Sequence, residues 1–348
     1  MKNIGVVEGF FGPAWPSEDR KSYAEFLSSV GAEFYIYAPK EDSHLRKAWR
    51  EEWDEDFIKK VRELKSHFAA HGIRFGLGFS PFGLGTNISE ADASHLKAKL
   101  ELITDLEIDM LGLFFDDMPT NENLARTQVE ALRLIQQSFT KKIIFCPSYY
   151  TYDPILEKVF GRMPQGYLED LASALPLDVS IAWTGPKVIS PELTGAHLIE
   201  VTTLLKRKPF IWENLFANDG PRNCKFLKLK PFSGRDQQAQ RESEAFSFNM
   251  MNQPQLSKIV FLASMYTLEG AGDPEEAFQR ALDVLTSQAF TEFFRRNRGL
   301  LASNLDLIPE TDKLRLRGEV GILKDLAAKE ISDWLTGVYT VGSECLTD

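Results

Sequence analysis

Length, composition and charge already restrict what this chain can be. Its 348 residues, 43% of them hydrophobic, suffice for a large buried core and fit either two ordinary domains or one barrel of about 250 residues with an appendage. The ordinary apolar fraction excludes disorder as the main state, and the formal net charge of −10 disfavours nucleic-acid and anionic-membrane partners, whose phosphates it repels.

Short runs rich in aliphatic and aromatic residues recur through the first 250 residues, and we interpret them as eight strands. Most are apolar throughout, which is typical of parallel strands covered on both faces. Successive runs end about 30 to 40 residues apart, the size of a strand, a loop and a helix. The predicted strands are residues 3–8, 33–38, 74–80, 110–115, 142–146, 178–183, 208–212 and 245–249.

Helical patterns fill several of the intervals between these strands. Residues 19–31 and 54–72 each run into a glycine, Gly31 and Gly72, as helices often do at their C-terminal cap. Residues 127–139 are amphipathic at helical spacing. Eight such units favour an α/β fold of the (β/α)₈ TIM-barrel type over an open doubly wound sheet.

The alternation stops after about residue 250, where long helical patterns follow one another. We expect helices over 255–268, 273–298 and 310–335. The sequence therefore predicts a catalytic barrel over residues 1–255 and a C-terminal α-helical region over 256–348 that packs on it.

The N-terminal segment and the cysteines bear on location. The apolar run near the N-terminus is short and interrupted by Glu8, unlike a signal peptide, and no window approaches the roughly 18 apolar residues of a membrane span. Three scattered cysteines do not indicate a disulfide framework. We therefore expect a cytoplasmic protein without a membrane partner; the sequence does not indicate its oligomeric state.

Polar and aromatic residues collect where the predicted strands end, and a TIM barrel has its active site at that rim. Carboxylates and amides bond sugar hydroxyls, and aromatic rings cover the apolar faces of a sugar. Each residue has a plain alternative: a solvated lysine, core tryptophans, turn-forming Asn and Asp. Their joint placement on seven of eight strand ends argues for a site formed by Glu8, Gly9, Lys40, Asp116, Asp117, Tyr150, Trp183, Trp212, Glu213, Asn214, Asp219 and Asn249.

Asp116 and Asp117 form the sharpest feature of this rim. Two close carboxylates cannot both ionise cheaply, so the pKa of one should rise, and glycoside hydrolysis needs a protonated acid beside an ionised carboxylate. Adjacent strand residues point to opposite sides, so we expect the two to reach different groups. A capping or turn pair at a strand–helix junction is an equally open interpretation.

Other chemistries have weaker support. The five histidines are dispersed without HxH or HExxH spacing, and the glycine-rich residues 76–85 match no phosphate-binding loop. We predict no metal and no cofactor, although a Mg²⁺ site at Asp116 and Asp117, serving a lyase or hydrolase, is an alternative.

Six motifs in order resemble the β-N-acetylglucosaminidases of glycoside hydrolase family 84, which includes O-GlcNAcases and enzymes once named hyaluronidases. The resemblance spans roughly residues 4 to 260 and implies a (β/α)₈ barrel. It further implies removal of terminal β-linked N-acetylglucosamine (GlcNAc) with retention, in which the 2-acetamido oxygen of the substrate forms an oxazoline intermediate. The motifs are GVVEGFFGPAW (5–15), YIYAPKED (35–42), FFDDMP (114–119), FCPSYY (145–150), AWTGPKVIS (182–190) and IWENLFANDGP (211–221).

The resemblance also implies roles for individual residues. Asp116 matches the residue that polarises the acetamido N–H, and Asp117 matches the general acid and base. Tyr150 matches a tyrosine that supports the acetamido group. The remaining matches are sugar-hydroxyl contacts for Gly9, Lys40 and Asn249, contacts to outer hydroxyls and the acetamido region for Asn214 and Asp219, and an aromatic wall for Trp212.

Three positions depart from the family pattern: Glu41, Phe82 and Tyr149. We expect Phe82 and Tyr149 to reshape the rim and so to affect substrate breadth. O-GlcNAc-modified protein is the expected substrate, and a glycan or a cell-wall fragment is the alternative. A GlcNAc-binding barrel that has lost catalysis is a second hypothesis, which the presence of both aspartates disfavours.

Overall fold

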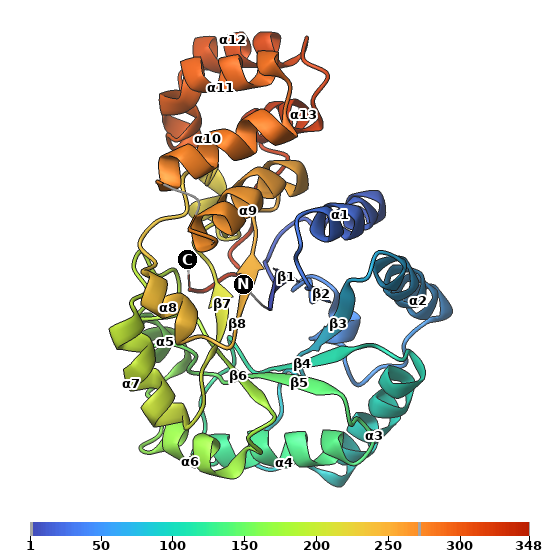
Figure 1. The fold of residues 1–348 in the computed structure, drawn as a ribbon. Coiled ribbons are helices and arrows are strands. Elements are labelled where there is room, and N and C mark those ends of the chain that lie inside the picture. Colours follow the sequence, from blue (N-terminus) through green and yellow to red (C-terminus); the bar gives the residue numbers. More distant parts are fainter. Residues whose placement is uncertain (1–2, 271–272, 348) are drawn as a thin grey trace.

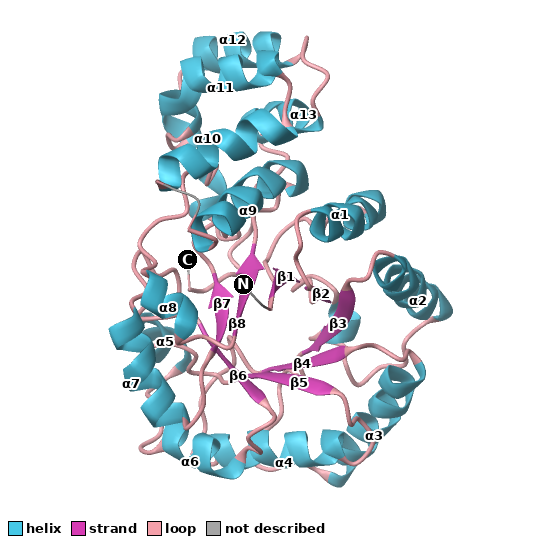
Figure 2. Cartoon of the chain, in the orientation of Figure 1, coloured by secondary structure: helices cyan, strands magenta, loops and turns pink. Residues whose placement is uncertain are grey.

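The computed structural model describes residues 3–270 and 273–347. Eight parallel strands close into a barrel in the order of the sequence, with helices around it (Figures 1 and 2). The predicted TIM barrel is confirmed, and each predicted strand overlaps an observed one. The strands are β1 (Ile4–Glu8), β2 (Phe34–Tyr37), β3 (Arg74–Phe79), β4 (Met110–Phe114), β5 (Lys142–Cys146), β6 (Ser180–Trp183), β7 (Phe210–Glu213) and β8 (Ala245–Asn249).

Glycines on the strands make room for large side chains inside the barrel. A Cβ atom on Gly5 would lie 2.2 Å from the carbonyl oxygen of Phe34, and one on Gly112 would lie 2.2 Å from the ring of Phe114. Both phenylalanines are buried. Such pairs of small and large residues allow the dense packing that is typical of protein interiors.

Helices follow the strands around the barrel. Gly31 and Gly72, just past the first two helices, have φ angles of +74° and +73°, which confirms the predicted C-terminal glycines. The helices up to residue 268 are α1 (Ser17–Ser29), α2 (Glu55–Ala70), α3 (Glu90–Asp105), α4 (Leu124–Gln136), α5 (Pro154–Phe160), α6 (Tyr167–Ala174), α7 (Gly195–Leu205), α8 (Gln237–Arg241) and α9 (Pro254–Leu268), with 3₁₀ turns at Ser43–Leu45 and Asn223–Lys225.

The C-terminal region contains more helices than predicted. The predictions of single helices over 273–298 and 310–335 are wrong, because each of these stretches is divided into two helices. Thr286 is extended at φ −132° and ψ 161°, and Ser287 accepts a hydrogen bond from the Phe290 amide to begin a new helix. The four helices are α10 (Pro274–Leu285), α11 (Gln288–Leu301), α12 (Glu310–Val320) and α13 (Leu326–Leu335), with a 3₁₀ turn at Leu305–Leu307.

The helical region docks on the barrel through α9. Glu330 of α13 accepts hydrogen bonds from the amides of Gln255 and Leu256 at 2.8 Å each, which satisfies the first turn of α9. Helix α9 is apolar on nearly all sides and packs against α1, α10 and α13. One continuous apolar core therefore runs through both regions, and the division at residue 255 stays a prediction.

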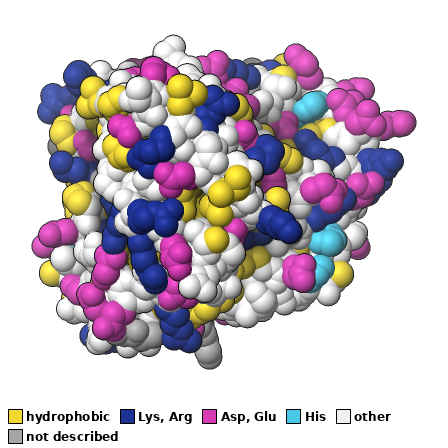
Figure 3. All heavy atoms as spheres, turned by 90° about the horizontal axis from the view of Figure 1, so that it is seen from above, with side chains coloured by type: hydrophobic (Ala, Val, Ile, Leu, Met, Phe, Trp, Pro, Cys, Tyr) yellow, Lys and Arg dark blue, Asp and Glu magenta, His cyan; other side chains and the backbone are white. Residues whose placement is uncertain are grey.

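The surface of the helical region is charged in both signs. Figure 3 shows acidic and basic side chains interspersed on the face seen from above Figure 1, with single hydrophobic side chains between them. None of the described helices has both the length and the apolar character needed to cross a membrane.

Candidate active site

One cavity lies at the carboxyl ends of the barrel strands, the place where TIM barrels carry their active sites. The structure brings together in it all nine residues to which the sequence analysis assigned site roles. The residues that line it are Gly9, Phe11, Lys40, Asp116, Asp117, Cys146, Tyr150, Thr184, Val188, Ile189, Trp212, Asn214, Ala217, Asp219, Asn223, Asn249, Cys345 and Thr347.

The backbone after β4 directs both aspartates into this cavity. Asp117 has a left-handed backbone with φ +57°, a conformation that costs energy for most residues and that Asp and Asn tolerate best. The strand ends at Phe114, so the alternation of strand side chains does not apply to Asp116 and Asp117, and both residues line the same cavity. That the two carboxylates reach different groups stays a prediction.

Asp116 is held as an anion. Its Oδ2 forms an ion pair with the Lys40 ammonium, and both side chains are buried. Burial alone would raise the pKa of Asp116, but the charges of Lys40 and Arg46 and the hydrogen bond from Lys40 outweigh it and hold the pKa below its ordinary value. Its other oxygen, Oδ1, is buried and has no hydrogen-bond partner among the described residues.

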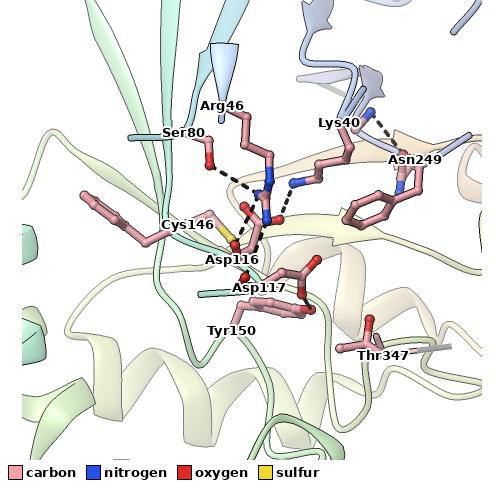
Figure 4. A network of polar contacts seen from close by, with 12 residues as sticks. Lys40, Arg46, Ser80, Asp116, Asp117, Cys146, Tyr150, Asn249 and Thr347 are labelled. Carbon is pink, nitrogen blue, oxygen red and sulfur yellow. Dashed lines mark hydrogen bonds and ion pairs between the residues drawn. The ribbon is translucent and has the colours of Figure 1, made fainter. Parts of the chain in front are cut away.

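Asp117 is in the opposite electrostatic situation. Burial and the negative charge of Asp116 raise its pKa above the ordinary value, as expected for one member of a close carboxylate pair. The Tyr150 hydroxyl lies 3.2 Å from Asp117 Oδ1 and donates to it (Figure 4). Burial and both aspartates also raise the pKa of Tyr150, so this hydroxyl keeps its proton.

Arg46 is a residue that the sequence analysis missed. Its guanidinium donates to the backbone carbonyl oxygens of Asp116 and Asp117 at 3.5 and 3.4 Å (Figure 4). It lies over the rings of Phe11 and Phe82, 5.9 and 4.9 Å from their centroids. The sequence does place Arg46 six residues after Lys40, in the loop that follows β2, and this position at the rim could have identified it as a site residue. We infer that Arg46 holds the turn that carries both carboxylates.

A chain of amides lines another side of the cavity. The Gly9 amide donates to Asn249 Oδ1 at 3.2 Å, Asn249 Nδ2 donates to Asn214 Oδ1 at 3.0 Å, and Asn214 Nδ2 donates to the carbonyl of Val188 at 3.0 Å. Each side chain is thereby fixed in orientation, as a site for specific hydroxyl groups requires.

Asp219 lies beside this chain of amides. It accepts the Phe11 amide at 2.9 Å. Burial raises its pKa to about 6, against the opposing effect of that hydrogen bond. Asp219 is therefore a polar group whose charge state changes near neutral pH.

Gly9 and Trp212 are matched in size. A Cβ atom on Gly9 would lie 2.4 Å from the Trp212 indole, so only glycine lets the ring stand at this place. The Lys40 ammonium lies 5.7 Å from the centre of the same ring. The indole forms an apolar wall next to the charged pair.

Three strand-end residues of the predicted rim do not line the cavity. Glu8 and Glu213 are buried in ion pairs with Arg20 and Arg235, and Trp183 is a core residue whose indole donates to His197 Nε2 at 3.0 Å. For Trp183 the plain interpretation as a core residue is correct, whereas the ion pairs of Glu8 and Glu213 were not predicted.

The three departures from the family pattern also lie outside the cavity lining. Glu41 is exposed. Tyr149 is buried, and its hydroxyl donates to the carbonyl of Gly161. Phe82 packs under Arg46. Phe82 and Tyr149 therefore do not line the cavity themselves, and their effect on substrate breadth stays a prediction.

The side chains that line the cavity suit proton transfer and the stabilisation of charge. Within the described ranges, no group of three or more His, Cys, Asp or Glu side chains is placed to hold a metal ion. An anion with one vacant acceptor lies beside an acid with a raised pKa, which is the pairing of environments that general acid catalysis needs.

Comparison with known proteins gives consistent matches. A sequence profile described as beta-N-acetylglucosaminidase matches residues 4–296. Two proteins named Protein O-GlcNAcase, from Rattus norvegicus and Mus musculus, are each 33% identical over 243 residues, which is 66% of this chain and 26% of the relative. The chain thus spans about a quarter of their length. The solved structure of an O-GlcNAc hydrolase mutant from Thermobaculum terrenum superposes with a TM-score of 0.77 at 28% identity, covering 92% of this chain and 71% of that one.

Proposed function

We propose, because this chain belongs to the β-N-acetylglucosaminidases of glycoside hydrolase family 84, that it removes terminal β-linked GlcNAc with retention of configuration. The nucleophile is the 2-acetamido oxygen of the substrate, and the intermediate is an oxazoline. One observation carries the proposal: a buried aspartate anion with a vacant oxygen beside a second aspartate with a raised pKa.

In this mechanism Asp116 acts on the acetamido group. Its vacant Oδ1 accepts the acetamido N–H, which orients the carbonyl oxygen toward the anomeric carbon. Positive charge develops on the acetamido group as the C–O bond to the leaving group breaks, and the Asp116 anion stabilises it. Lys40 keeps Asp116 ionised throughout.

Asp117 supplies the proton. It donates to the glycosidic oxygen in the first step and, as a carboxylate, removes a proton from the water that opens the oxazoline in the second. The raised pKa fits the first role, and the Tyr150 hydroxyl stabilises the carboxylate formed in between. A second carboxylate that forms a covalent bond to the sugar, as in most retaining glycosidases, is not needed, because the substrate supplies the nucleophile.

The test is hydrolysis of aryl β-N-acetylglucosaminides whose N-acetyl group carries zero to three fluorine atoms. Fluorine weakens the acetamido oxygen as a nucleophile, so the rate should fall with each atom, and the first sugar product should be the β-anomer by NMR. A rate that does not respond to fluorine, or an α-anomer as first product, would contradict the mechanism. No hydrolysis at any pH from about 5 to 8, the range in which most proteins are stable, would leave the GlcNAc-binding barrel as the better account.

The natural leaving group is a second part of the proposal. We propose that it is the serine or threonine of an O-GlcNAc-modified protein, supported by the names of the relatives that this chain resembles. Release of GlcNAc from a GlcNAc-serine peptide tests it. Cleavage of aryl glycosides and chitobiose without cleavage of the peptide would favour a glycan or a cell-wall fragment instead.

A further inference from the structure

The end of the described chain returns to the barrel instead of staying with the C-terminal helices (Figure 1). Val341 is buried in a small cluster with Phe11 and Cys224. It packs so closely on the loop after β1 that a Cβ atom on Gly12 would lie 2.7 Å from its Cγ2. Further along, Glu344 forms an ion pair with Lys47 at 3.2 Å. We refer to residues 341–347 as the strap.

Two contacts fix the strap on the rim of the barrel. Its ion pair with Lys47 is exposed on both sides, and such pairs contribute little. Burial of the Val341 side chain contributes more, because it removes apolar surface from water. Val341 is therefore the anchor that sets where the residues after it lie.

Beyond the anchor, alternate residues of the strap turn toward the catalytic cavity. Cys345 and Thr347 line it, whereas Leu346 between them is 56% exposed and does not. Figure 4 shows Thr347 at the edge of the network formed by Asp117 and Tyr150. The strap thus contributes side chains from the far end of the chain to a cavity that the barrel otherwise forms.

The position of the strap within the cavity indicates what it meets. The charged pair and the amides that line the cavity are almost fully buried, whereas Cys345 and Thr347 are only partly buried. If the sugar binds the buried groups, as the proposed function requires, the group attached to it points toward the more exposed lining, where the strap lies.

We propose that the strap is a wall of the leaving-group subsite and that Thr347 limits the bulk of the leaving group. This inference rests on the proposed function, because it needs a GlcNAc-bearing substrate in the cavity. The two described strap residues that line the cavity, Cys345 and Thr347, carry a thiol, a hydroxyl and a methyl group, so we expect them to discriminate by size. Its partners would be leaving groups with a narrow first segment, such as a serine side chain on a peptide.

The test compares Thr347→Trp with Leu346→Trp in the full chain. The substrates are two aryl β-N-acetylglucosaminides whose phenols have equal acidity, one phenol small and the other bulky, so that chemistry is matched and only size differs. We expect Thr347→Trp to lower kcat/KM for the bulky substrate at least tenfold more than for the small one. Leu346→Trp, on the exposed side of the same segment, should change neither.

A second variant tests the opposite direction. Val341→Asp places a carboxylate at the buried anchor, which is costly without a partner, and should release the strap. The ratio of kcat/KM for the bulky over the small substrate should then rise at least threefold. Binding of a GlcNAc-thiazoline, which has no leaving group, should stay within threefold of wild type and shows that the sugar site is folded.

The outcomes separate the two proposals. Equal losses on both substrates in Thr347→Trp, or a tenfold loss of thiazoline binding, would place the strap against the sugar and overturn the inference. An unchanged ratio of kcat/KM for the bulky over the small substrate, in either Thr347→Trp or Val341→Asp, would overturn the inference as well. A wild-type enzyme that binds the thiazoline but hydrolyses neither substrate would refute the proposed function, on which the inference depends.

Discussion

Two sets of carboxylates at strand ends show the difference between a structural and a functional acid. Glu8 at the end of β1 accepts from Arg20 Nε and Nη2 at 2.7 Å each, from the Trp15 amide at 3.2 Å and from the Tyr35 hydroxyl. Every lone-pair direction is in use. After β4, by contrast, one buried oxygen of Asp116 has no hydrogen-bond partner in the described part of the chain, and Asp117 is repelled by its neighbour.

The comparison of Glu8 with Asp116 shows which property distinguishes a carboxylate in the candidate active site from a structural one. Burial does not, because Glu8 and Asp116 are both buried. Hydrogen bonding does separate these two carboxylates, because buried polar groups in folded proteins nearly always have partners and an orphan carboxylate oxygen needs an explanation. In the proposed mechanism the substrate N–H is the partner of Asp116 Oδ1. The comparison predicts that changes at β1 cost stability, whereas changes at β4 cost mainly activity.

The largest expected effect is that of Asp117→Asn. Loss of the proton donor should lower kcat/KM by about 10²- to 10⁴-fold for alkyl leaving groups and much less for activated phenols, which leave without a proton. Thermal stability should not fall, because Asn tolerates the left-handed backbone and removes the repulsion by Asp116. Equal losses for both kinds of leaving group would remove Asp117 as the acid.

Glu8→Gln should give the opposite pattern. The Arg20 guanidinium would stay buried without a counter-charge, so the free energy of unfolding should fall by about 3–5 kcal/mol, measured by urea denaturation. Thiazoline affinity of the folded fraction should persist. Glu18→Gln, which breaks the exposed pair with Lys21, is the control and should change nothing measurable. A Glu8→Gln enzyme that is as stable as wild type but inactive would show that Glu8 is a functional and not a structural carboxylate.

Asp116→Asn should lower kcat/KM by about 10²- to 10³-fold, since it removes the charge that stabilises the developing positive acetamido group. The loss should be similar for alkyl and activated leaving groups, because Asp116 acts on the acetamido group and not on the leaving oxygen. A Brønsted series of aryl glycosides measures it. If the Brønsted slope steepens for Asp116→Asn as much as for Asp117→Asn, the assignment of Asp117 as the general acid is wrong.

The pH profile of kcat/KM should have two limbs of about tenfold per unit. Activity falls toward acid, as Asp116, whose pKa is lowered, takes up a proton that it must not carry. It falls toward alkali, as Asp117, whose pKa is raised, loses the proton that it must donate. With an activated phenol as the substrate, Asp117→Asn should lose the alkaline limb and keep the acid limb. Persistence of the alkaline limb would assign it to another group, such as Asp219.

The smallest expected effect is that of a chelator. Lys40 already neutralises Asp116, and the described residues offer no cluster of three metal ligands. Excess EDTA should therefore leave the hydrolysis rate within experimental error. A loss that added Mg²⁺ restores would support the alternative of a magnesium-dependent enzyme.

The fold was largely predictable from local sequence patterns. The helix division that the prediction missed depends on tertiary contacts. The spacing of apolar runs predicts all eight strands, because parallel strands in a barrel are buried on both faces. The division between α10 and α11 was missed because apolar periodicity continues through it. Contacts from elsewhere fix the break: the amide and hydroxyl of Ser287 both donate to Asp325 at 2.7 Å.

The site was predictable in position but not in detail. The rule that strand ends form the rim, together with the family motifs, collects the nine residues in one cavity. It does not separate Glu8 and Glu213 from the aspartates, since their arginine partners are identified only by folding. Nor does it find Thr347, which reaches the cavity from the other end of the chain.

The most direct test of the central claim is a crystal structure with a bound GlcNAc-thiazoline, which mimics the oxazoline. We expect the thiazoline nitrogen, in its protonated form, to donate to Asp116 Oδ1 at about 3 Å, Lys40 to remain on Oδ2, and Asp117 to face the anomeric carbon. A thiazoline nitrogen bound by another group, with Asp116 Oδ1 still vacant, would contradict it.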